Sequence, residues 1–287
     1  MNVAATQCLP GVSAGVYGEA DFEAIRALVH REAGIVLPPG KAMLVYSRLA
    51  PLVRKTASDT FARYIDKLRS DNAERHRAIC ALTTNHTFFY REAHHFEHFE
   101  QHVRGPLIDR LEMGEPVRIW SAGCSSGEEI WSLLMTMLGP DLSTGRKIAA
   151  RDLVVLASDL ANHALDTAKA ARYPADTLDP VPARLRDPWV NVSGDMAAIG
   201  RDLTNMVRFR ELNLLGEWPM KRKFDVIFCR NVMIYFDQPT KERLVERFAQ
   251  QLLPGGHLYI GHSERVSGRA SHMLEPVGNT IYCRVGS

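Results

Sequence analysis

The stretch at 118–135, RIWSAGCSSGEEIWSLLM, constrains the fold more than any other part of the chain. It passes from an apolar run through a tight turn of small residues into a segment with helical character. Three more short apolar runs follow it, LVVLASD, FDVIFCRN and HLYIGHS, and each is succeeded by a turn. Strands that alternate with helices in this way are typical of a doubly wound, mostly parallel sheet. The sequence therefore predicts an α/β domain after Pro116.

Three segments of this domain carry weaker signals. The last two apolar runs, HLYIGHS and TIYCRV, are separated too briefly for a crossover helix, so we expect them to form an antiparallel edge. Residues 139–152 (GPDLSTGRKIAARD) have the composition of a surface loop that extends the first crossover. Residues 174–207 contain four prolines and the short strand patterns WVNVS and AAIG. They predict a small β-subdomain inserted between the second and third strand–helix units.

The chain before residue 116 has a different pattern. From Asp21 to about Arg110 the apolar residues recur at intervals of three and four, for example at Phe22 and Ile25. This periodicity predicts an all-helical unit. Pro51 lies inside one of the helical stretches, where a proline should kink the helix or mark a late start.

That same helical stretch is basic. Lys41, Arg48 and Lys55 recur every seven residues, Arg54 is adjacent, and no acidic residue occurs from 33 to 58. Residues spaced by seven share one face of a helix. The stripe is either a solvated face or a docking strip for an acidic partner.

Composition narrows the class of protein. The formal charge of +2 at pH 7 is near balance, so no overall field favours nucleic acid. The cysteines are odd in number and lack CxxC spacing, which favours a reducing compartment over disulfides or zinc (Cys8, Cys80, Cys124, Cys229 and Cys283). No apolar run is long enough to span a bilayer, and the N-terminus does not resemble a signal peptide. We expect a cytoplasmic protein.

The turn at 123–127, GCSSG, supports two interpretations. It matches G-x-S-x-G, the nucleophile elbow of serine hydrolases, with Ser125 as nucleophile. His257 or His262 would then be the base and Asp159 or Asp237 the acid. However, an elbow normally follows several earlier strands, and here the preceding part of the chain is helical. The same strand–turn–helix geometry places a cofactor against bare backbone, and we favour that interpretation.

Acidic residues around the turn indicate the kind of cofactor. Asp159 ends the second apolar run, where such folds place a carboxylate on ribose hydroxyls. Glu128 and Glu129 follow the turn directly and would repel a pyrophosphate, so a dinucleotide is disfavoured and a cationic ligand is favoured. Alternatively, both glutamates merely compensate the helix N-terminus.

The segment REAHHFEHFEQH has the residue types and spacing of a possible metal site. His94 and His98, and likewise His98 and His102, are four residues apart, and Glu97 is nearby. No further set of ligands is evident in the sequence, so we expect no metal.

Several stretches together resemble the chemoreceptor glutamate methyltransferases of bacterial chemotaxis, the CheR family. They occur in order from about residue 20 to the end, and TTNxTxFF-REAHHF and FCRNVMIYF are highly specific. The matching stretches are LTTNHTFFYREAHHF (82–96), RIWSAGCSSGEE (118–129), LASDL (156–160), NLL (213–215), FDVIFCRNVMIYFD (224–237) and LLPGGHLYIGHSE (252–264).

The resemblance implies an α/β, Rossmann-like class I methyltransferase domain that uses S-adenosylmethionine, contains a small β-subdomain and follows an all-helical domain. We expect a flexible tail, a helical domain, a linker or helix, and the methyltransferase domain, at 1–18, 19–90, 91–115 and 116–287 respectively, with the β-subdomain at about 174–207. The implied cofactor-binding residues are Asn85, Thr87, Arg91, Glu129, Asp159, Asn213, Leu214, Arg230 and Asn231.

The resemblance also implies the reaction and the partner. The chain would esterify glutamate side chains of chemoreceptor cytoplasmic domains, with Arg91 holding a carboxylate and Tyr235 lining the path of methyl transfer. The basic helix would contact the receptor through Arg48 and Arg54. The loop around residues 192–195 lacks the glycine-rich sequence of members that bind a receptor pentapeptide tether, so we expect a tether-independent enzyme, monomeric and without nucleic acid. The alternatives are a serine hydrolase and a non-catalytic relative that binds S-adenosylmethionine.

Overall fold

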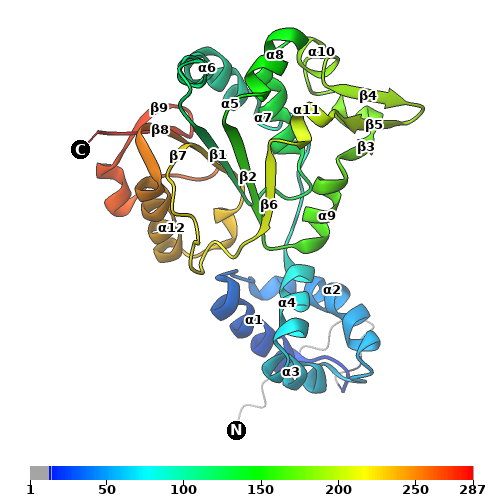
Figure 1. Cartoon of the computed structure of the whole chain (residues 1–287). Coiled ribbons are helices and arrows are strands. Elements are labelled where there is room, and N and C mark those ends of the chain that lie inside the picture. The colour runs from blue at the N-terminus through cyan, green and yellow to red at the C-terminus, as the bar shows by residue number, and fades with distance from the viewer. Residues whose placement is uncertain (1–12, 14, 287) are drawn as a thin grey trace. The chain divides into compact units, whose positions relative to one another are not determined.

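The structure is a computed structural model that describes residue 13 and residues 15–286. The described chain forms two compact units (Figure 1). The first comprises the residues up to Thr84 together with Tyr235–Asp237, and the second comprises Asn85–Ile234 and the residues from Gln238 onward. Most of the tail predicted at 1–18, including Cys8, lies outside the described residues.

The first unit is all-helical, as predicted. Its aromatic core joins Tyr17 to Phe61, whose ring centroids are 4.4 Å apart. The buried Tyr64 hydroxyl donates a hydrogen bond of 2.8 Å to Glu74. Gly34 ends the first helix in the left-handed conformation at φ 67°. The helices are α1 (Glu19–Ala33), the 3₁₀ turn η1 (Pro39–Lys41), α2 (Ala42–Lys55), α3 (Phe61–Ser70) and α4 (Asn72–Leu82).

Helix α2 continues through Pro51. It begins well before this residue, at Ala42, so the alternative of a late helix start is wrong. The side chains of Val45, Leu49 and Val53 are buried on one face of the helix. Burial of this face offsets the loss of the one backbone hydrogen bond that a proline cannot donate.

The second unit contains a seven-stranded sheet in the order β6-β2-β1-β7-β8-β10-β9. β6, β2, β1, β7 and β8 are parallel, whereas β10 is antiparallel to both of its neighbours. The predicted Rossmann-like domain is therefore confirmed. The strands are β1 (Val117–Ala122), β2 (Leu153–Asp159), β6 (Val207–Glu211), β7 (Phe224–Cys229), β8 (Leu252–Ile260), β9 (Leu274–Gly278) and β10 (Ile281–Arg284).

The last two apolar runs pair in antiparallel orientation, as predicted, but this pair does not form the edge of the sheet. Tyr282 of β10 pairs with Leu258 of β8. Strand β9, which the sequence did not indicate, then covers β10 and becomes the edge of the sheet. β9 contains Pro276 and is mostly exposed, as is usual for edge strands.

Helices flank this sheet, some before β1 and the others on its crossover connections. They are α5 (Ala93–His98), a π-helical turn η2 (Phe99–Val103), α6 (Arg104–Glu112), α7 (Glu128–Leu138), α8 (Leu142–Ala149), α9 (Asn162–Ala170) and α12 (Gln238–Gln251). Two 3₁₀ turns, η4 (Met233–Tyr235) and η5 (Gly268–His272), complete the connections. None of the helices formed by the described residues is long and apolar enough to cross a membrane.

Residues 139–152 were expected to form a loop, and this expectation is wrong because they contain α8. Asp141 caps the helix by accepting a hydrogen bond of 2.7 Å from the Thr144 backbone N–H. Ile148 is buried. A Cβ atom on Gly145 would lie 2.4 Å from the Trp189 ring, so the indole packs directly on the helix backbone.

The β-subdomain is a three-stranded sheet in the order β3-β5-β4, on the β6 side of the main sheet in Figure 1. Ser193 pairs with Met196, which leaves a two-residue turn at Gly194 and Asp195. Gly194 has a φ of 62°. The subdomain elements are β3 (Arg172–Pro174), η3 (Ala175–Leu178), α10 (Ala183–Arg186), β4 (Val190–Ser193), β5 (Met196–Ile199) and α11 (Arg201–Thr204).

Candidate functional site

β1 and β7 are neighbouring parallel strands at the centre of the sheet. The chain continues from β1 to β2 on one side and from β7 to β8 on the other, so the order of strands reverses at this point. Ligands of doubly wound sheets bind at the carboxyl ends of the strands where this reversal occurs. The turn at 123–127 follows β1, and Arg230 and Asn231 follow β7.

The turn after β1 depends on its small residues. Gly123 has a φ of 83°, and a Cβ atom there would lie 2.4 Å from Val232 Cγ2. Gly127 has a φ of 100°, and its Cβ would lie 2.9 Å from the Tyr173 hydroxyl. Ser125 adopts a φ of 49° although it is not glycine. Such left-handed non-glycine residues are uncommon and concentrate at functional sites.

The surroundings of Ser125 are not those of a catalytic nucleophile. Its hydroxyl donates a hydrogen bond of 3.1 Å to the backbone oxygen of Asn85, and the residue is buried. A nucleophilic serine requires a base within hydrogen-bond reach, and no described histidine is hydrogen-bonded to this hydroxyl. The hydroxyl instead ties Asn85, a predicted cofactor residue, to the turn.

Asp159 lies at the end of β2, directly beside the turn. Its Oδ2 accepts the backbone N–H of Ser125 at 2.8 Å, and its Oδ1 accepts that of Ala161 at 2.8 Å. Burial raises the pKa of this carboxyl. A carboxylate offers about four acceptor positions, so these backbone bonds leave capacity for a ligand hydroxyl.

The Asp159 backbone also positions the segment after β6. Its carbonyl oxygen accepts the Leu212 N–H at 3.0 Å. Asn213 Oδ1 then accepts the Leu215 N–H at 3.0 Å, which closes a turn, and Leu214 is buried. The structure thus brings three predicted residues, Asp159, Asn213 and Leu214, to neighbouring strand ends.

Glu129 and Arg230 form a buried ion pair. Arg230 Nε donates to Glu129 Oε2 at 2.7 Å, and Ser121 Oγ donates to the other oxygen at 2.7 Å. The side chains are 3% and 10% exposed for Arg230 and Glu129 respectively. The Arg230 guanidinium lies 5.1 Å from the centre of the Phe96 ring. The Glu129 charge is therefore compensated by Arg230 as well as by the N-terminus of α7.

Glu128 has a different environment. The Ser126 hydroxyl lies 2.9 and 2.8 Å from its two oxygens and donates to the carboxylate. Burial raises the pKa of the Glu128 carboxyl.

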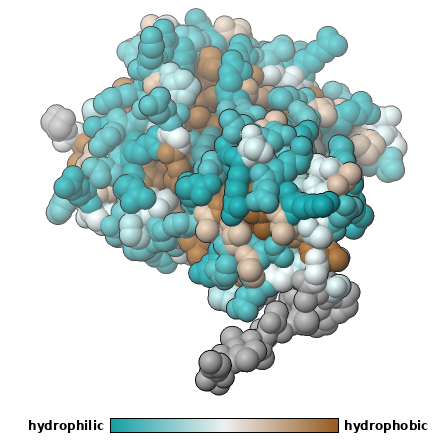
Figure 2. All heavy atoms as spheres, turned by 90° about the horizontal axis from the view of Figure 1, so that it is seen from below, coloured by the Kyte–Doolittle hydropathy of each residue, from teal (hydrophilic) through white to brown (hydrophobic). Residues whose placement is uncertain are grey.

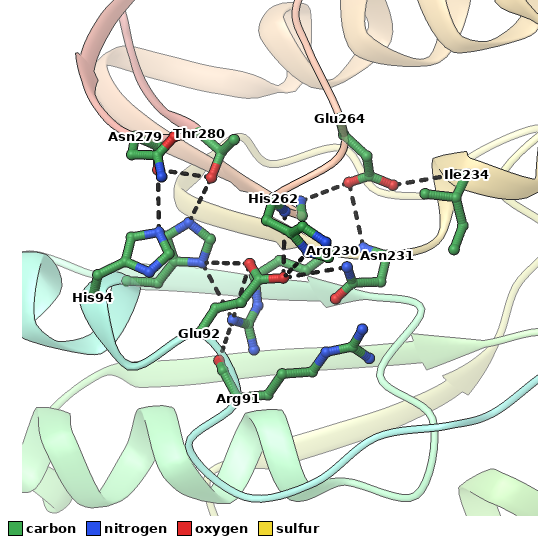
Figure 3. Close-up of polar contacts among 12 residues, drawn as sticks. Arg91, Glu92, His94, Arg230, Asn231, Ile234, His262, Glu264, Asn279 and Thr280 are labelled. Atoms are coloured by element: carbon green, nitrogen blue, oxygen red, sulfur yellow. Dashed lines mark hydrogen bonds and ion pairs between the residues drawn. The ribbon is translucent and has the colours of Figure 1, made fainter.

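Arg91 takes part in the site in two ways. Its backbone oxygen accepts a hydrogen bond from Arg230 Nη1. Its side chain donates to the His86 carbonyl at 2.9 Å and lies 5.6 Å from the centre of the exposed Phe88 ring. Figure 3 shows the guanidinium directed away from the neighbouring polar network. Thr87, also predicted, is half-buried in the same segment.

Glu92 is a central residue of that network, and sequence reasoning missed it. Its Oε1 accepts hydrogen bonds from Asn231 Nδ2 at 3.2 Å and from His262 Nδ1 at 3.0 Å (Figure 3). Its Oε2 lies 3.4 Å from His95 Nδ1 and 3.8 Å from Arg230 Nη1. Burial alone would raise the pKa of Glu92, but the His262 hydrogen bond and the Arg230 charge lower it. Glu92 joins the segment after Arg91 to the ends of β7 and β8.

Glu264 is the second residue that was missed. Its carboxylate accepts backbone N–H groups of Gly261 at 2.6 Å, Asn231 at 3.3 Å and Ile234 at 3.2 Å. It thereby holds the chain after β7 against the chain after β8. Both Glu92 and Glu264 lie inside the stretches that match the family, and that position was the available signal.

The histidine segment packs against the sheet. His98 Nδ1 is hydrogen-bonded to the Tyr259 hydroxyl at 3.0 Å, and the His98 ring lies 4.8 Å from His102 and 5.9 Å from His257. Among the described residues, no group of three or more histidine, cysteine or acidic side chains is arranged to hold a metal ion.

These histidines predict acid sensitivity. Burial and the nearby His98 and His102 lower the pKa of His257 to about 4, and burial with Arg230 lowers that of His95 to about 3. Below about pH 6.5 these two histidines are protonated in the unfolded chain but stay neutral in the folded chain. The free energy of unfolding therefore falls as pH decreases. We expect the Tm to drop between pH 7 and pH 5, and to drop less in His257→Gln, by differential scanning fluorimetry. An equal drop in both proteins would contradict this assignment.

The remaining predicted residues belong to the first unit. Arg48 Nη1 donates to the carbonyl oxygens of Leu82 at 2.9 Å and Thr83 at 2.7 Å, at the C-terminal end of α4. Arg54 is exposed. The backbone oxygen of Tyr235 accepts the Val36 N–H at 2.8 Å, and Tyr235 thus belongs to the first compact unit.

The residues of the second unit fit an adenosyl sulfonium. Asp159 offers a buried carboxyl group for ribose hydroxyls, Leu214 offers apolar surface, and Glu128 lies beside the turn, hydrogen-bonded to Ser126. The two carboxylates disfavour phosphate groups at the turn. These residues therefore fit a nucleoside ligand that carries no pyrophosphate.

Comparison with known proteins decides between the remaining interpretations. Residues 85–283 match the family model described as the CheR methyltransferase SAM-binding domain, and residues 20–83 match the CheR all-alpha domain. The chain belongs to the CheR methyltransferase family. It therefore contains an S-adenosylmethionine-binding methyltransferase domain, and the serine hydrolase is not favoured.

Relatives in the CheR family match nearly the full length of the chain. A probable chemotaxis protein methyltransferase of Rhizobium etli is 42% identical over 89% of this chain and 96% of its own length. Chemotaxis protein methyltransferase 2 of Pseudomonas aeruginosa is 38% identical over 93% of each chain. The chemotaxis protein methyltransferase of Escherichia coli is 38% identical over 92% of this chain and 90% of its own.

Proposed function

We propose that this enzyme methylates glutamate side chains in the cytoplasmic domains of chemoreceptors, which forms glutamate methyl esters for chemosensory adaptation. The observation that carries the proposal is the site where the strand order reverses between β1 and β7. There the Asp159 carboxyl accepts the Ser125 backbone N–H of the turn at 123–127. The family match and the names of the relatives support the chemosensory role.

The chemistry fits a site without a general base. S-adenosylmethionine supplies a methyl group on a sulfonium centre. A glutamate side chain with a pKa of about 4.3 is already ionised at neutral pH and needs no deprotonation before it attacks. The residues of the chain then accelerate the reaction by orienting the reactants and by excluding water. This accounts for Ser125 donating only to a backbone oxygen.

The proposed contacts with the cofactor follow from the geometry. Asp159 would accept the ribose hydroxyls, and Leu214 would contact the adenine. Arg91 would bind a carboxylate through its bidentate fork, because its guanidinium is directed away from the Glu92 network. The other residues that would line this site are Asn85, Thr87, Glu129, Asn213, Arg230 and Asn231.

Kinetic constants distinguish the proposed roles of Arg91 and Tyr235. Arg91→Ala should weaken binding of S-adenosylmethionine by about 10–100-fold, since it removes a charged hydrogen-bonding group. Tyr235→Ala should lower kcat and leave cofactor affinity unchanged, because this side chain would line only the path of methyl transfer. Isothermal titration calorimetry and steady-state kinetics measure both effects. Unchanged affinity and turnover in Arg91→Ala would remove the first role, and unchanged kcat in Tyr235→Ala would remove the second.

The β4–β5 turn supports independence from a receptor tether. It has only Gly194 and Asp195 between the paired residues Ser193 and Met196. We expect equal kcat/KM for a receptor cytoplasmic domain and for the same domain without its last five residues. A loss of more than tenfold on truncation would contradict tether independence and leave glutamate methylation intact.

A further inference from the structure

The groups proposed to hold the nucleoside lie on one side of the point where the strand order reverses. The turn at 123–127, Asp159 and Leu214 follow β1, β2 and β6 respectively. The ends of β7 and β8 lie on the other side, where the chain continues into the segments that contain Asn231 and His262. A methyl acceptor has to approach from a part of this edge that the nucleoside does not fill. The ends of β7 and β8 are therefore where an acceptor side chain would enter.

His262 is held at the end of β8 by a single carboxylate oxygen. Its Nδ1 donates to Glu92 Oε1 at 3.0 Å, and its backbone N–H donates to the same oxygen at 3.3 Å (Figure 3). An ionised carboxylate only accepts hydrogen bonds, so Nδ1 carries a proton. The His262 side chain is 63% exposed, and none of the described residues is hydrogen-bonded to its Nε2. The ring is thus oriented through Nδ1, which leaves Nε2 for a ligand.

The Glu92 carboxylate is placed by an unusual local structure. Glu92 and Asn231 have φ values of 57° and 59°, in the left-handed region that side chains rarely adopt. Glu92 Oε2 is buried without a hydrogen-bond partner among the described residues, 3.4 Å from His95 Nδ1 and 3.8 Å from Arg230 Nη1. Strained backbone concentrates at functional sites, and an unsatisfied buried oxygen costs stability. Stability alone therefore does not account for the position of Glu92.

Polar groups, rather than a broad apolar surface, would recognise a partner. The face shown in Figure 2 is largely hydrophilic, with only small apolar areas. At the ends of β7 and β8, however, two arginines are already engaged. Arg230 is 3% exposed and its Nε donates to Glu129. Arg265 Nη1 donates to the carbonyl oxygens of His262 and Glu264 at 2.8 and 2.6 Å, which holds the guanidinium against its own loop. His262 is therefore the side chain best placed there to donate an N–H to an anion.

We propose that His262 binds the carboxylate of the methyl-accepting glutamate, and that Glu92 is the positioning residue that orients the His262 ring. In the protonated imidazole, Nδ1 donates to Glu92 and Nε2 donates to one oxygen of the acceptor. The other acceptor oxygen forms the bond to the methyl carbon while the carbon–sulfur bond breaks, and the electron pair of that bond stays on sulfur. No proton is transferred, so no general base is needed. The inference rests on the proposed function for the identity of the acceptor.

Substitution of His262 tests the contact with the acceptor. His262→Ala should lower kcat/KM for a receptor cytoplasmic domain by about 10–100-fold, because a charged hydrogen bond is lost. Its Tm and its affinity for S-adenosylhomocysteine should stay unchanged, since the exposed ring lies outside the groups that hold the nucleoside. Added imidazole should restore part of the activity, which it could not do for a purely structural loss. His272→Ala, at another exposed histidine of the same unit, is the control and should behave as the wild type. Equal kcat/KM in His262→Ala and the wild type would overturn the proposal.

A double substitution tests the positioning role of Glu92. Glu92→Gln keeps the shape of the side chain but removes the charge that orients Nδ1, and it should lower kcat/KM by about tenfold. Because Glu92 acts through His262, the same substitution in the His262→Ala protein should change kcat/KM by less than about twofold. An equal loss in both proteins would contradict the positioning role.

Footprinting with diethyl pyrocarbonate, which acylates accessible histidine nitrogens, locates the contact without turnover. With S-adenosylhomocysteine present, a bound receptor domain should slow the modification of His262 severalfold and leave that of His272 unchanged. A bound domain that does not protect His262 would overturn this inference and leave the proposed function intact. Protection of His262 without methyl transfer would support the contact and contradict only the proposed function. Wild-type protein that neither binds nor methylates any receptor domain would overturn both.

Discussion

An Arg230→Met protein is expected to lose about 3–5 kcal/mol of unfolding free energy and nearly all methyl-transfer activity. The substitution leaves the Glu129 carboxylate buried, with the Ser121 hydroxyl as its remaining side-chain donor at 2.7 Å. It also removes the hydrogen bond that Arg230 donates to the Arg91 carbonyl. Urea denaturation followed by circular dichroism measures the loss of stability.

A double substitution separates charge burial from packing. Glu129→Gln/Arg230→Met removes both charges, and methionine still packs on the Phe96 ring, so the double variant should be more stable than Arg230→Met. Arg184→Met is the control, because its ion pair with Glu100 is 52% exposed on the arginine side and should change stability by about 1 kcal/mol or less. A double variant no more stable than Arg230→Met would contradict the assignment.

Asp159→Asn is expected to weaken S-adenosylmethionine binding by about 100-fold. The amide keeps one oxygen, but its NH₂ group must face either the Ser125 N–H or the Ala161 N–H, both of which are donors. The substitution also removes the negative acceptor for the ribose hydroxyls. Charged hydrogen bonds contribute about 1.5–3 kcal/mol each, and about 2.7 kcal/mol corresponds to this loss in affinity.

Calorimetry with S-adenosylhomocysteine checks the Asp159 prediction without a receptor. Asp152→Asn is a suitable control, since Asp152 lies just before β2 and forms an exposed ion pair with Arg118. It should bind the cofactor product as the wild type does. Wild-type affinity in Asp159→Asn would show that this carboxylate does not hold the ligand.

Much of the fold could be predicted because the central strands are buried. All six residues of β7 are buried and all except Asp225 are apolar, so the run FDVIFC stands out. β6 was missed because its sequence, VRFRE, alternates charged residues on an exposed face. Helix α8 was missed because its stability depends on Trp189, which is distant in sequence.

The site shows the same division between local and distant information. Asp159 was predicted because it ends an apolar run beside a glycine-rich turn. Glu92 and Glu264 were missed because both contact Asn231, which is distant from each of them in sequence and approaches only in the folded chain. A Cβ atom on Gly261 would lie 2.6 Å from Asn231 Nδ2, and no spacing in the sequence indicates such a close approach.

The most direct test of the central claim is incubation with methyl-labelled S-adenosylmethionine and a panel of chemoreceptor cytoplasmic domains. The expected result is label in a receptor that mild base releases as methanol, and that disappears when the modified glutamates are replaced by alanine. Label that resists base, or well-folded enzyme that binds the cofactor but labels none of the domains, would contradict glutamate ester formation.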